Sequence, residues 1–272
     1  MEKQKITIQL IECQKLYSDN NEINKETFAS LENFILENDT PFLLLKSYKG
    51  KKYIQAQNFV GVIQLKNGFT LEILPKITDL EKDVTKSKEI LIKMINSLDI
   101  IKKPIISWSE IFLLNENFST YKDKNIALTL LFDMNTLFES YIGQFFKKNC
   151  KAYREYEIKL QDKSHFLAID NNNNNHFPLK LDVVIKVTDE NNKIKEHVIF
   201  DTKWRHLQQN DKISQPDLYQ MYVYGTKYEN CKVIYLVYPY TENWLRPREY
   251  RLNKNLSLKI LFFDLKIDEF IM

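Results

Sequence analysis

Three charged residues in the second half of the chain have the types and the spacing of a hydrolytic metal centre. Asp201 and Lys203 stand two positions apart at the end of an apolar run, so in a strand both side chains point to the same face. A turn centred on Asn191 and Asn192 would fold the preceding apolar run back as a hairpin. That register predicts Asp182 directly across from Asp201.

Two like charges on neighbouring strands normally destabilise a sheet. A divalent cation between them removes this objection, because Mg²⁺, or Mn²⁺ in its place, is held by one or two carboxylates together with substrate phosphate oxygens. The metal would lower the pKa of a water and polarise a phosphodiester. Lys203 would orient or deprotonate the attacking water, or neutralise charge that develops on the phosphate. The predicted chemistry is phosphodiester cleavage.

Two helices offer further polar groups to this centre. Glu139 flanks an apolar helical stripe, with Ile142 and Phe146 as its helical neighbours, so we expect it to be part-buried. An unpaired part-buried carboxylate is costly, and a nearby metal would offset that cost. Gln220 and Tyr224 stand at i and i+4 on one helix face, where an amide and a phenol could brace the hairpin or contact the scissile strand.

Each of these residues also has an ordinary structural interpretation. An Asp-x-Lys tripeptide alone is typical of a surface charge pair, a helical glutamate is commonly solvated, and Gln220 and Tyr224 can form structural hydrogen bonds without catalysis. Trp204 and Arg205, directly after the catalytic strand, could support the site or contact the DNA backbone, with packing as the alternative for Trp204. The four histidines show no ligand spacing that would favour zinc.

The elements that must position these residues divide the chain into three predicted parts. Residues 1–80 are expected to form a small, mostly β module, because Asn67-Gly68 between alternating apolar runs is a strong hairpin pattern in which both turn residues take positive φ. Residues 81–125 are expected to be a helical and irregular connector. Residues 126–272 are expected to form an α/β domain with a mixed central sheet, beginning with a long helix at Ile126.

The composition is that of an ordinary soluble globular protein. Hydrophobic residues make up 44% and charged residues 28% of the 272 residues. The net charge of +3 is weak evidence for or against nucleic acid. Apolar runs are too short to span a bilayer, the N-terminus lacks a secretion signal, and three scattered cysteines fit a reducing cytoplasm.

The order of helix with Glu139, strand with Asp182, strand with Asp201-x-Lys203 and helix with Gln220-x-x-x-Tyr224 resembles the PD-(D/E)xK nuclease superfamily. Pro178 is displaced from its usual place directly before Asp182, so only the aspartate carries over. The resemblance implies a metal-dependent nuclease in which Asp182, Asp201 and Glu139 bind the metal, and Lys203 and Gln220 complete the catalytic set.

A closer resemblance is to the McrC family, the nuclease subunits of McrBC-type modification-dependent restriction systems, including their LlaJI-like relatives. The blocks that carry it span both halves of the chain: Asn58–Leu65, Leu71–Lys76, Leu131–Ile142, Leu181–Ile185 and Ile199–Trp204. McrC proteins usually have a longer, largely helical segment between the helix that ends near Leu98 and the block that begins at Leu131; here that interval is short.

The McrC resemblance implies double-stranded DNA as substrate and a GTP-hydrolysing AAA+ partner of the McrB type, on which the N-terminal module docks and whose GTPase it stimulates. The chain has five glycines and no Gly-x-x-x-x-Gly-Lys loop, so it is not the motor itself. Two copies could pair at the nuclease domain during double-strand cleavage. Two other readings stay open: a stand-alone nuclease, and an inactive subunit that regulates a motor.

Overall fold

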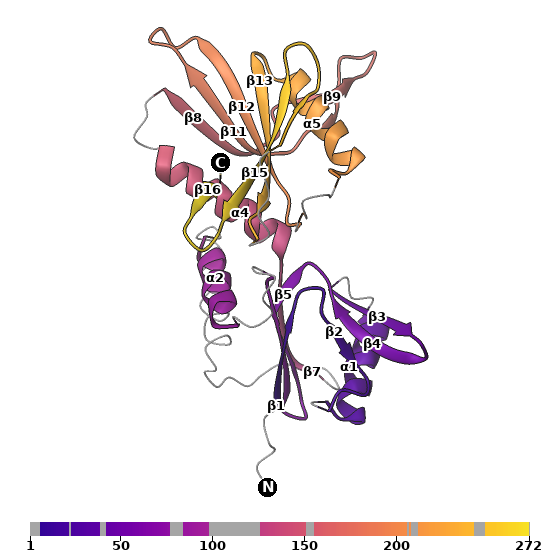
Figure 1. The fold of residues 1–272 in the computed structure, drawn as a ribbon. Helices are drawn as coiled ribbons and strands as arrows, with labels where there is room; N and C mark the ends of the chain where they lie inside the picture. The colour runs from indigo at the N-terminus through magenta and orange to yellow at the C-terminus, as the bar shows by residue number, and fades with distance from the viewer. Residues whose placement is uncertain are drawn as a thin grey trace. The chain divides into compact units, whose positions relative to one another are not determined.

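The computed structural model describes residues 6–21, 23–38, 42–76, 84–97, 126–150, 155–205, 207, 212–241 and 248–271 (Figure 1). The chain divides into two compact units, Met1–Leu137 and Phe138–Met272, here called unit 1 and unit 2. In the part of the chain that is described, no helix is long and apolar enough to cross a membrane.

Unit 1 is mostly β, as the sequence predicts for its first 80 residues. Its described strands form a four-stranded sheet in the order β1-β6-β5-β7 and a three-stranded sheet in the order β2-β4-β3. Their bounds are β1 Ile6–Ile11, β2 Lys15–Tyr17, β3 Leu43–Tyr48, β4 Lys51–Ala56, β5 Phe59–Leu65, β6 Phe69–Leu74 and β7 Ile126–Asp133. Helix α1 (Lys25–Asn38) packs Phe28, Leu31 and Ile35 into the apolar core that both sheets share.

The predicted hairpin between β5 and β6 is present, but its turn differs from the predicted type. Ile63 pairs with Leu71, and Gly68 N donates to Leu65 O at 3.1 Å. Gly68 has φ +91°, whereas Asn67 is absent from the described residues with positive φ. The Asn67 side chain instead accepts from Phe69 N at 3.0 Å. One glycine therefore supplies all the left-handed backbone that the turn needs.

The long helix predicted from Ile126 is wrong in its first two turns. Residues 126–133 form strand β7, which pairs antiparallel with β5 over Phe59 to Leu65. The helix α4 (Met134–Cys150) starts only after Asp133, whose carboxylate accepts from Asn135 N and Thr136 N. Pairing with an existing sheet edge outweighs the helical spacing of the apolar residues here. The strand thus belongs to unit 1, although the sequence assigned residues 126–272 to one domain.

Within the predicted connector, helix α2 (Val84–Asn96) is present and buries Ile90, Leu91, Met94 and Ile95. Lys88 on this helix pairs with the buried Glu72 carboxylate of β6 at 2.7 Å. The irregular stretch expected between Ile100 and Asn125 lies outside the described residues.

Unit 2 has the mixed central sheet that the sequence predicts. Its described strands give a seven-stranded sheet in the order β14-β15-β13-β12-β11-β8, with β16 paired to β15, and a two-stranded ribbon of β9 and β10. Strands β12, β13 and β15 run parallel, and the other pairings are antiparallel. The bounds are β8 Tyr156–Asp162, β9 Phe166–Ile169, β10 Asn175–Pro178, β11 Leu181–Thr188, β12 Ile194–Thr202, β13 Cys231–Pro239, β14 Arg248–Arg251, β15 Ser257–Asp264 and β16 Glu269–Ile271.

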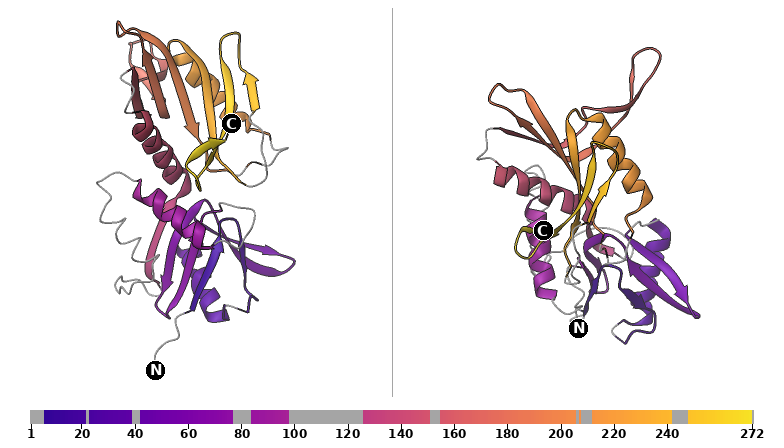
Figure 2. Two further views of the ribbon diagram at one scale, coloured as in Figure 1. Left: turned by 60° about the vertical axis from the view of Figure 1, so that its left-hand side comes forward. Right: turned by 45° about the horizontal axis from the view of Figure 1, so that its top comes forward.

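Helices α4 and α5 (Gln215–Lys227) cover the two faces of this sheet (Figures 1 and 2). Side chains alternate along β12, so Ile199 and Phe200 point to opposite faces. Phe200 packs against Phe146 of α4 with ring centroids 4.4 Å apart, and Ile199 shares a core with Met221 of α5. Strands with parallel neighbours need such cover because both of their faces are apolar.

The β11–β12 hairpin has the register that the sequence predicts. Val183 pairs with Phe200 and Val184 with Ile199, and a shift of one residue occurs only near the turn, at Thr188. The Asp189 carboxylate accepts from the backbone N–H of Asn191 and of Lys193 and so closes that turn. The register therefore stays fixed at the opposite end of the hairpin, where Asp182 and Asp201 lie.

The contact of α5 with the sheet generates a stability prediction at Gly225. A Cβ at this position would lie 2.5 Å from Leu256 Cδ2 and 2.8 Å from Ile234 Cδ1, and both residues are buried. Alanine usually stabilises a helix interior by about 1 kcal/mol over glycine. We expect the reverse for Gly225→Ala, a loss of about 1–2 kcal/mol from overpacking, seen as a lower urea midpoint.

Gly143→Ala in α4 is the matched control. Its Cβ would meet the side chain of Leu160 at 2.9 Å, and Leu160 is only half-buried, so it can rotate away. Gly143→Ala should leave the midpoint unchanged or raise it. Equal effects of the two substitutions would contradict the packing argument.

Candidate active site

The candidate catalytic residues lie at one end of the unit 2 sheet, in a row across three neighbouring strands. Leu181 pairs with Asp162 and Val183 with Leu160, which sets Asp182 level with Gln161 of β8. The β11–β12 register extended by one residue sets Asp182 level with Asp201. The geometry thus confirms the predicted opposition of the two aspartates and adds Gln161 on the far side of Asp182.

Asp201 is the buried member of the row, with only 1% of its surface exposed. Burial and the neighbouring Asp182 charge raise the pKa of Asp201 to about 7, against the opposing effect of Lys203. Lys203 Nζ lies 2.5 Å from Asp201 Oδ2. Burial alone would lower the pKa of Lys203, but Asp201 and then Asp182 raise it above its usual value. Lys203 is therefore a full cation at neutral pH.

Asp182 is held by the strand end opposite to it. Its Oδ2 accepts from Thr202 N and from Thr202 Oγ1, each at 2.7 Å. Two donors on one carboxylate oxygen fix the orientation of the Asp182 side chain. Thr202 is itself buried, so this bracket is rigid.

Glu139 joins the row from helix α4. Its side chain is 14% exposed, and Lys180 Nζ lies 3.4 Å from Glu139 Oε1. Burial and the Asp182 charge raise the pKa of Glu139, while Lys180 and the Gln161 side chain act in the opposite direction. Asp182 therefore interacts electrostatically with both Glu139 and Asp201, and Glu139 is part-buried, as the sequence predicts.

A chain of hydrogen bonds connects Lys203 to helix α5. Lys203 Nζ donates to Gln220 Oε1 at 3.3 Å, and Gln220 Nε2 donates to the Tyr224 hydroxyl at 2.6 Å. Tyr224 in turn donates to the backbone carbonyl of Lys180 at 2.7 Å. The amide and the phenol that the sequence singled out thus fix the ammonium group of Lys203, and they reach the segment that leads into Asp182.

Trp204 and Arg205 have separate environments. Trp204 is 3% exposed and packs edge-on against Phe138 of α4, with ring centroids 5.5 Å apart. Packing is therefore its role in the structure, and a direct DNA contact through its ring would require it to leave the core. Arg205 is exposed and follows the strand, as expected from the sequence.

The donor set fits a hard divalent cation in chemistry. Glu139 Oε1 and Asp201 Oδ2 are buried oxygens without a well-directed hydrogen bond among the described residues, and each has one lysine as its nearest cation. Among the described residues, no three side chains of His, Cys, Asp or Glu lie close enough together to form a ready-made metal site. Mg²⁺ needs no such cage, because it usually keeps several waters and takes one or two carboxylates with substrate phosphates.

Sequence reasoning missed four residues that contact the row. Gln161, Lys180 and Thr202 touch the carboxylates of Glu139 or Asp182, and Asp217 of α5 adds negative charge near Asp201. Thr202 could have been found, because it lies between Asp201 and Lys203. Gln161 and Lys180 depend on the pairing of β8 with β11, for which the loop between them gives no register.

Comparison with known proteins places the chain in a family context. The family model described as "McrBC 5-methylcytosine restriction system component" matches residues 54–104 and 101–239. These matches cover the β5–β6 hairpin and every residue of the row. No curated protein sequence matches the chain.

Solved structures give a similar fold. A chain from the refined half-complex of the tetradecameric assembly of Thermococcus gammatolerans McrB AAA+ hexamers with bound McrC matches with TM-score 0.62 and 13% identity, covering 95% of this chain and 94% of that chain. A chain of the cryo-EM structure of the Thermococcus gammatolerans McrBC complex matches with TM-score 0.26 and 14% identity, over 60% of this chain and 51% of that chain. The first match shows a shared fold, and the second is too weak to carry an argument.

The raised pKa of Asp201 generates a prediction about stability and pH in metal-free protein. Because the folded pKa of about 7 exceeds the ordinary value of 3.8, folding takes up a proton at pH values between the two, and stability is lost as pH rises through them. Asparagine at this position does not ionise. We expect Asp201→Asn to raise the melting temperature by a few degrees at pH 8 in EDTA, and to raise it much less at pH 5.

Glu190→Gln, at the exposed turn of the same hairpin, serves as the control for this experiment, with no expected change at either pH. Melting temperatures from calorimetry would check the result. A stabilisation by Asp201→Asn that is equal at pH 5 and pH 8 would contradict the assigned origin of the shift.

Proposed function

The chain belongs to the McrBC 5-methylcytosine restriction system component family, and from this premise we propose that it is the McrC-like, DNA-cleaving subunit of such a system. The proposed reaction is hydrolysis of a phosphodiester in double-stranded DNA at the row of Asp182, Asp201 and Lys203. The observation that carries the proposal is a buried carboxylate, Asp201, kept beside a second carboxylate and a lysine at a sheet end.

Asp182 and Asp201 would hold Mg²⁺, or Mn²⁺ in its place, and Glu139 would join them as a third ligand once its oxygen is released by Lys180. When bound, the ion would supply Lewis-acid polarisation of the phosphodiester and neutralise part of its charge. The two donors of Thr202 both bind Asp182 Oδ2, which leaves Oδ1 of that carboxylate for the ion. Lys180 now pairs with Glu139 Oε1, and it would have to move away before this oxygen could bind the ion.

Lys203 would act as a positioned cation. Its ammonium group lies between the Asp201 carboxylate and the Gln220 amide, and 27% of its side-chain surface is exposed. A cation fixed at this place stabilises negative charge that develops on the phosphoryl oxygens in the transition state. Gln220 and Tyr224 reduce the freedom of the lysine, so the charge needs little reorganisation during the reaction.

A GTP-hydrolysing AAA+ subunit of the McrB type is the proposed partner. The solved assembly that shares this fold contains McrB AAA+ hexamers with bound McrC. Unit 1 is compact by itself and carries none of the row, so it is the unit we assign to docking on the motor and to stimulation of its GTPase. The row is a single centre, so cutting both strands calls for transient pairing of two copies of unit 2.

Plasmid cleavage tests the catalytic proposal. With Mg²⁺, GTP and the cognate McrB-type subunit, we expect the wild-type chain to cut DNA and Asp201→Asn to lower the rate by at least about a thousandfold, because one charge of the metal-binding pair is lost. Glu190→Gln should cut like the wild type. Cleavage that needs Asp201 but neither partner nor GTP would identify a stand-alone nuclease instead.

GTP hydrolysis by the partner tests the docking role of unit 1 separately. Since Asp201 lies in unit 2, Asp201→Asn should stimulate the GTPase as strongly as the wild-type chain does. Phosphate release at matched concentrations of the two subunits would measure this. Stimulation by both forms without cleavage by either would favour a purely regulatory subunit, and stimulation by neither would remove the docking role.

A further inference from the structure

A two-stranded ribbon, β9–β10, projects from unit 2 beside α5 (Figures 1 and 2). It pairs Ile169 with Asn175 and Ala168 with His176, and it lies in the chain between β8 and the catalytic strand β11. Asp182 lies four positions after the end of the ribbon at Pro178, a reach of at most about 14 Å. The ribbon is therefore tied directly to the edge that carries the row.

The ribbon exposes large apolar side chains that the fold does not use. Leu167, Ile169 and Phe177 are 47%, 65% and 69% exposed. Phe177 also has φ +58°, the one aromatic residue in the described chain with left-handed backbone. An aromatic residue in this conformation costs free energy, and here it gains no burial in return. Neither local preference nor core packing explains these exposed residues.

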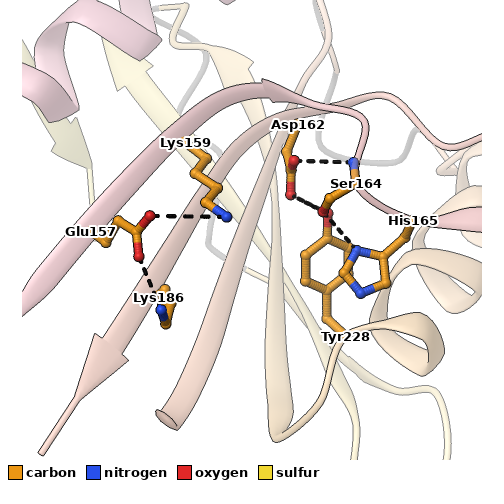
Figure 3. A network of polar contacts seen from close by, with 7 residues as sticks. All are labelled: Glu157, Lys159, Asp162, Ser164, His165, Lys186 and Tyr228. Carbon is orange, nitrogen blue, oxygen red and sulfur yellow. Dashed lines mark hydrogen bonds and ion pairs between the residues drawn. The ribbon is translucent and has the colours of Figure 1, made fainter. Parts of the chain in front are cut away.

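The base of the ribbon is rigid. Tyr228, at the end of α5, donates to Asp162 Oδ2 at 2.6 Å, and Ser164 donates to the same oxygen at 2.8 Å (Figure 3). The His165 ring lies 4.0 Å from the Tyr228 ring, and Lys227 Nζ donates to Leu167 O at 2.9 Å. An isolated two-stranded hairpin is marginally stable, and these bonds hold this one against α5.

The tip of the ribbon carries one carboxylate, which hydrogen bonds from within the turn hold in place. Asp170 is the only acidic residue from Lys163 to Lys180. Its carboxylate accepts from Asn172 N, from Asn174 N and Nδ2, and from His176 Nε2 when that ring nitrogen is protonated. Lysines lie at both ends of the segment, and Lys227 lies against its side. The remaining tip consists of exposed asparagine amides, which can donate and accept hydrogen bonds.

We propose that the β9–β10 ribbon enters a groove of the DNA beside the scissile phosphodiester, with Ile169 and Phe177 against sugars and base edges and the asparagines at the tip as hydrogen-bonding partners. A two-stranded ribbon fits a DNA groove, and exposed apolar side chains inserted at base steps are a known means of holding DNA. Three apolar residues on strands this short are too small a patch for a stable protein interface, which needs about 800 Å² from each partner. This inference rests on the proposed nuclease function.

Binding of a fluorescein-labelled 30-base-pair duplex tests the ribbon. In the Asp201→Asn background, which prevents cleavage, the double substitution Ile169→Ser with Phe177→Ser should weaken the Kd by about tenfold, as loss of apolar groove contacts does. Ile267→Ser, which removes an apolar residue of the same unit that is 58% exposed, should leave the Kd unchanged. Fluorescence anisotropy would report both.

A second pair of variants tests the tip by charge. Asn171 is exposed and outside the hydrogen bonds of Asp170, so Asn171→Lys should tighten DNA binding and Asn171→Glu should weaken it, each by about threefold or more at low salt. The opposite signs cannot come from a loss of folding. Equal Kd values for the wild type, the double variant and both tip variants would overturn the proposal.

The same variants with an intact Asp201 separate this inference from the proposed function. Asp201-dependent plasmid cleavage that the double variant retains in full would overturn the ribbon contact and leave the nuclease proposal intact. A loss of self-association or of GTPase stimulation, with DNA binding unchanged, would assign the ribbon to a protein partner and overturn the DNA contact. No Asp201-dependent cleavage by the wild type would overturn the nuclease proposal, and the binding comparison would still decide whether the ribbon touches DNA.

Discussion

The repulsion between two carboxylates on neighbouring strands is the constraint to which the rest of unit 2 responds. Asp201 is almost fully buried and lies level with Asp182. Two apolar residues at these positions would cost the fold much less free energy. Local contacts offset this cost for each carboxylate: Lys203 pairs with Asp201, and Thr202 donates two hydrogen bonds to Asp182. These polar groups therefore act together to reduce the electrostatic repulsion between the two aspartates.

The helices that bury the sheet are the same helices that complete this solution. Strands β12, β13 and β15 run parallel, so both of their faces need apolar cover, which α4 supplies through Phe146 and α5 through Met221. Once the helices are docked, their polar residues have fixed places: Glu139 beside Asp182, and Gln220 at Lys203. The apolar contacts set the positions, and the polar groups gain their precision from packing.

The sequence predicted those parts of the site that local periodicity determines. A period of two along β12 placed Asp201 and Lys203 on one face, and the turn after Thr188 fixed the register that brings Asp182 opposite. Non-local pairing was outside its reach: the apolar spacing after Ile126 fits a helix, but β5 offers that segment an open sheet edge. For the same reason the β8 register, and with it Gln161, could not be obtained before the structure.

The hydrogen-bond chain that begins at Lys203 ends at the segment that joins the β9–β10 ribbon to Asp182. Tyr224 bonds to the carbonyl of Lys180, which lies between the end of the ribbon at Pro178 and Asp182. A displacement of β10 would therefore move the acceptor of Tyr224 and, through Gln220, the ammonium group of Lys203. Contact at the ribbon and the position of the lysine are mechanically linked through one buried phenol. Under the proposed function, DNA held at the ribbon would therefore act on the position of Lys203 through Tyr224 and Gln220.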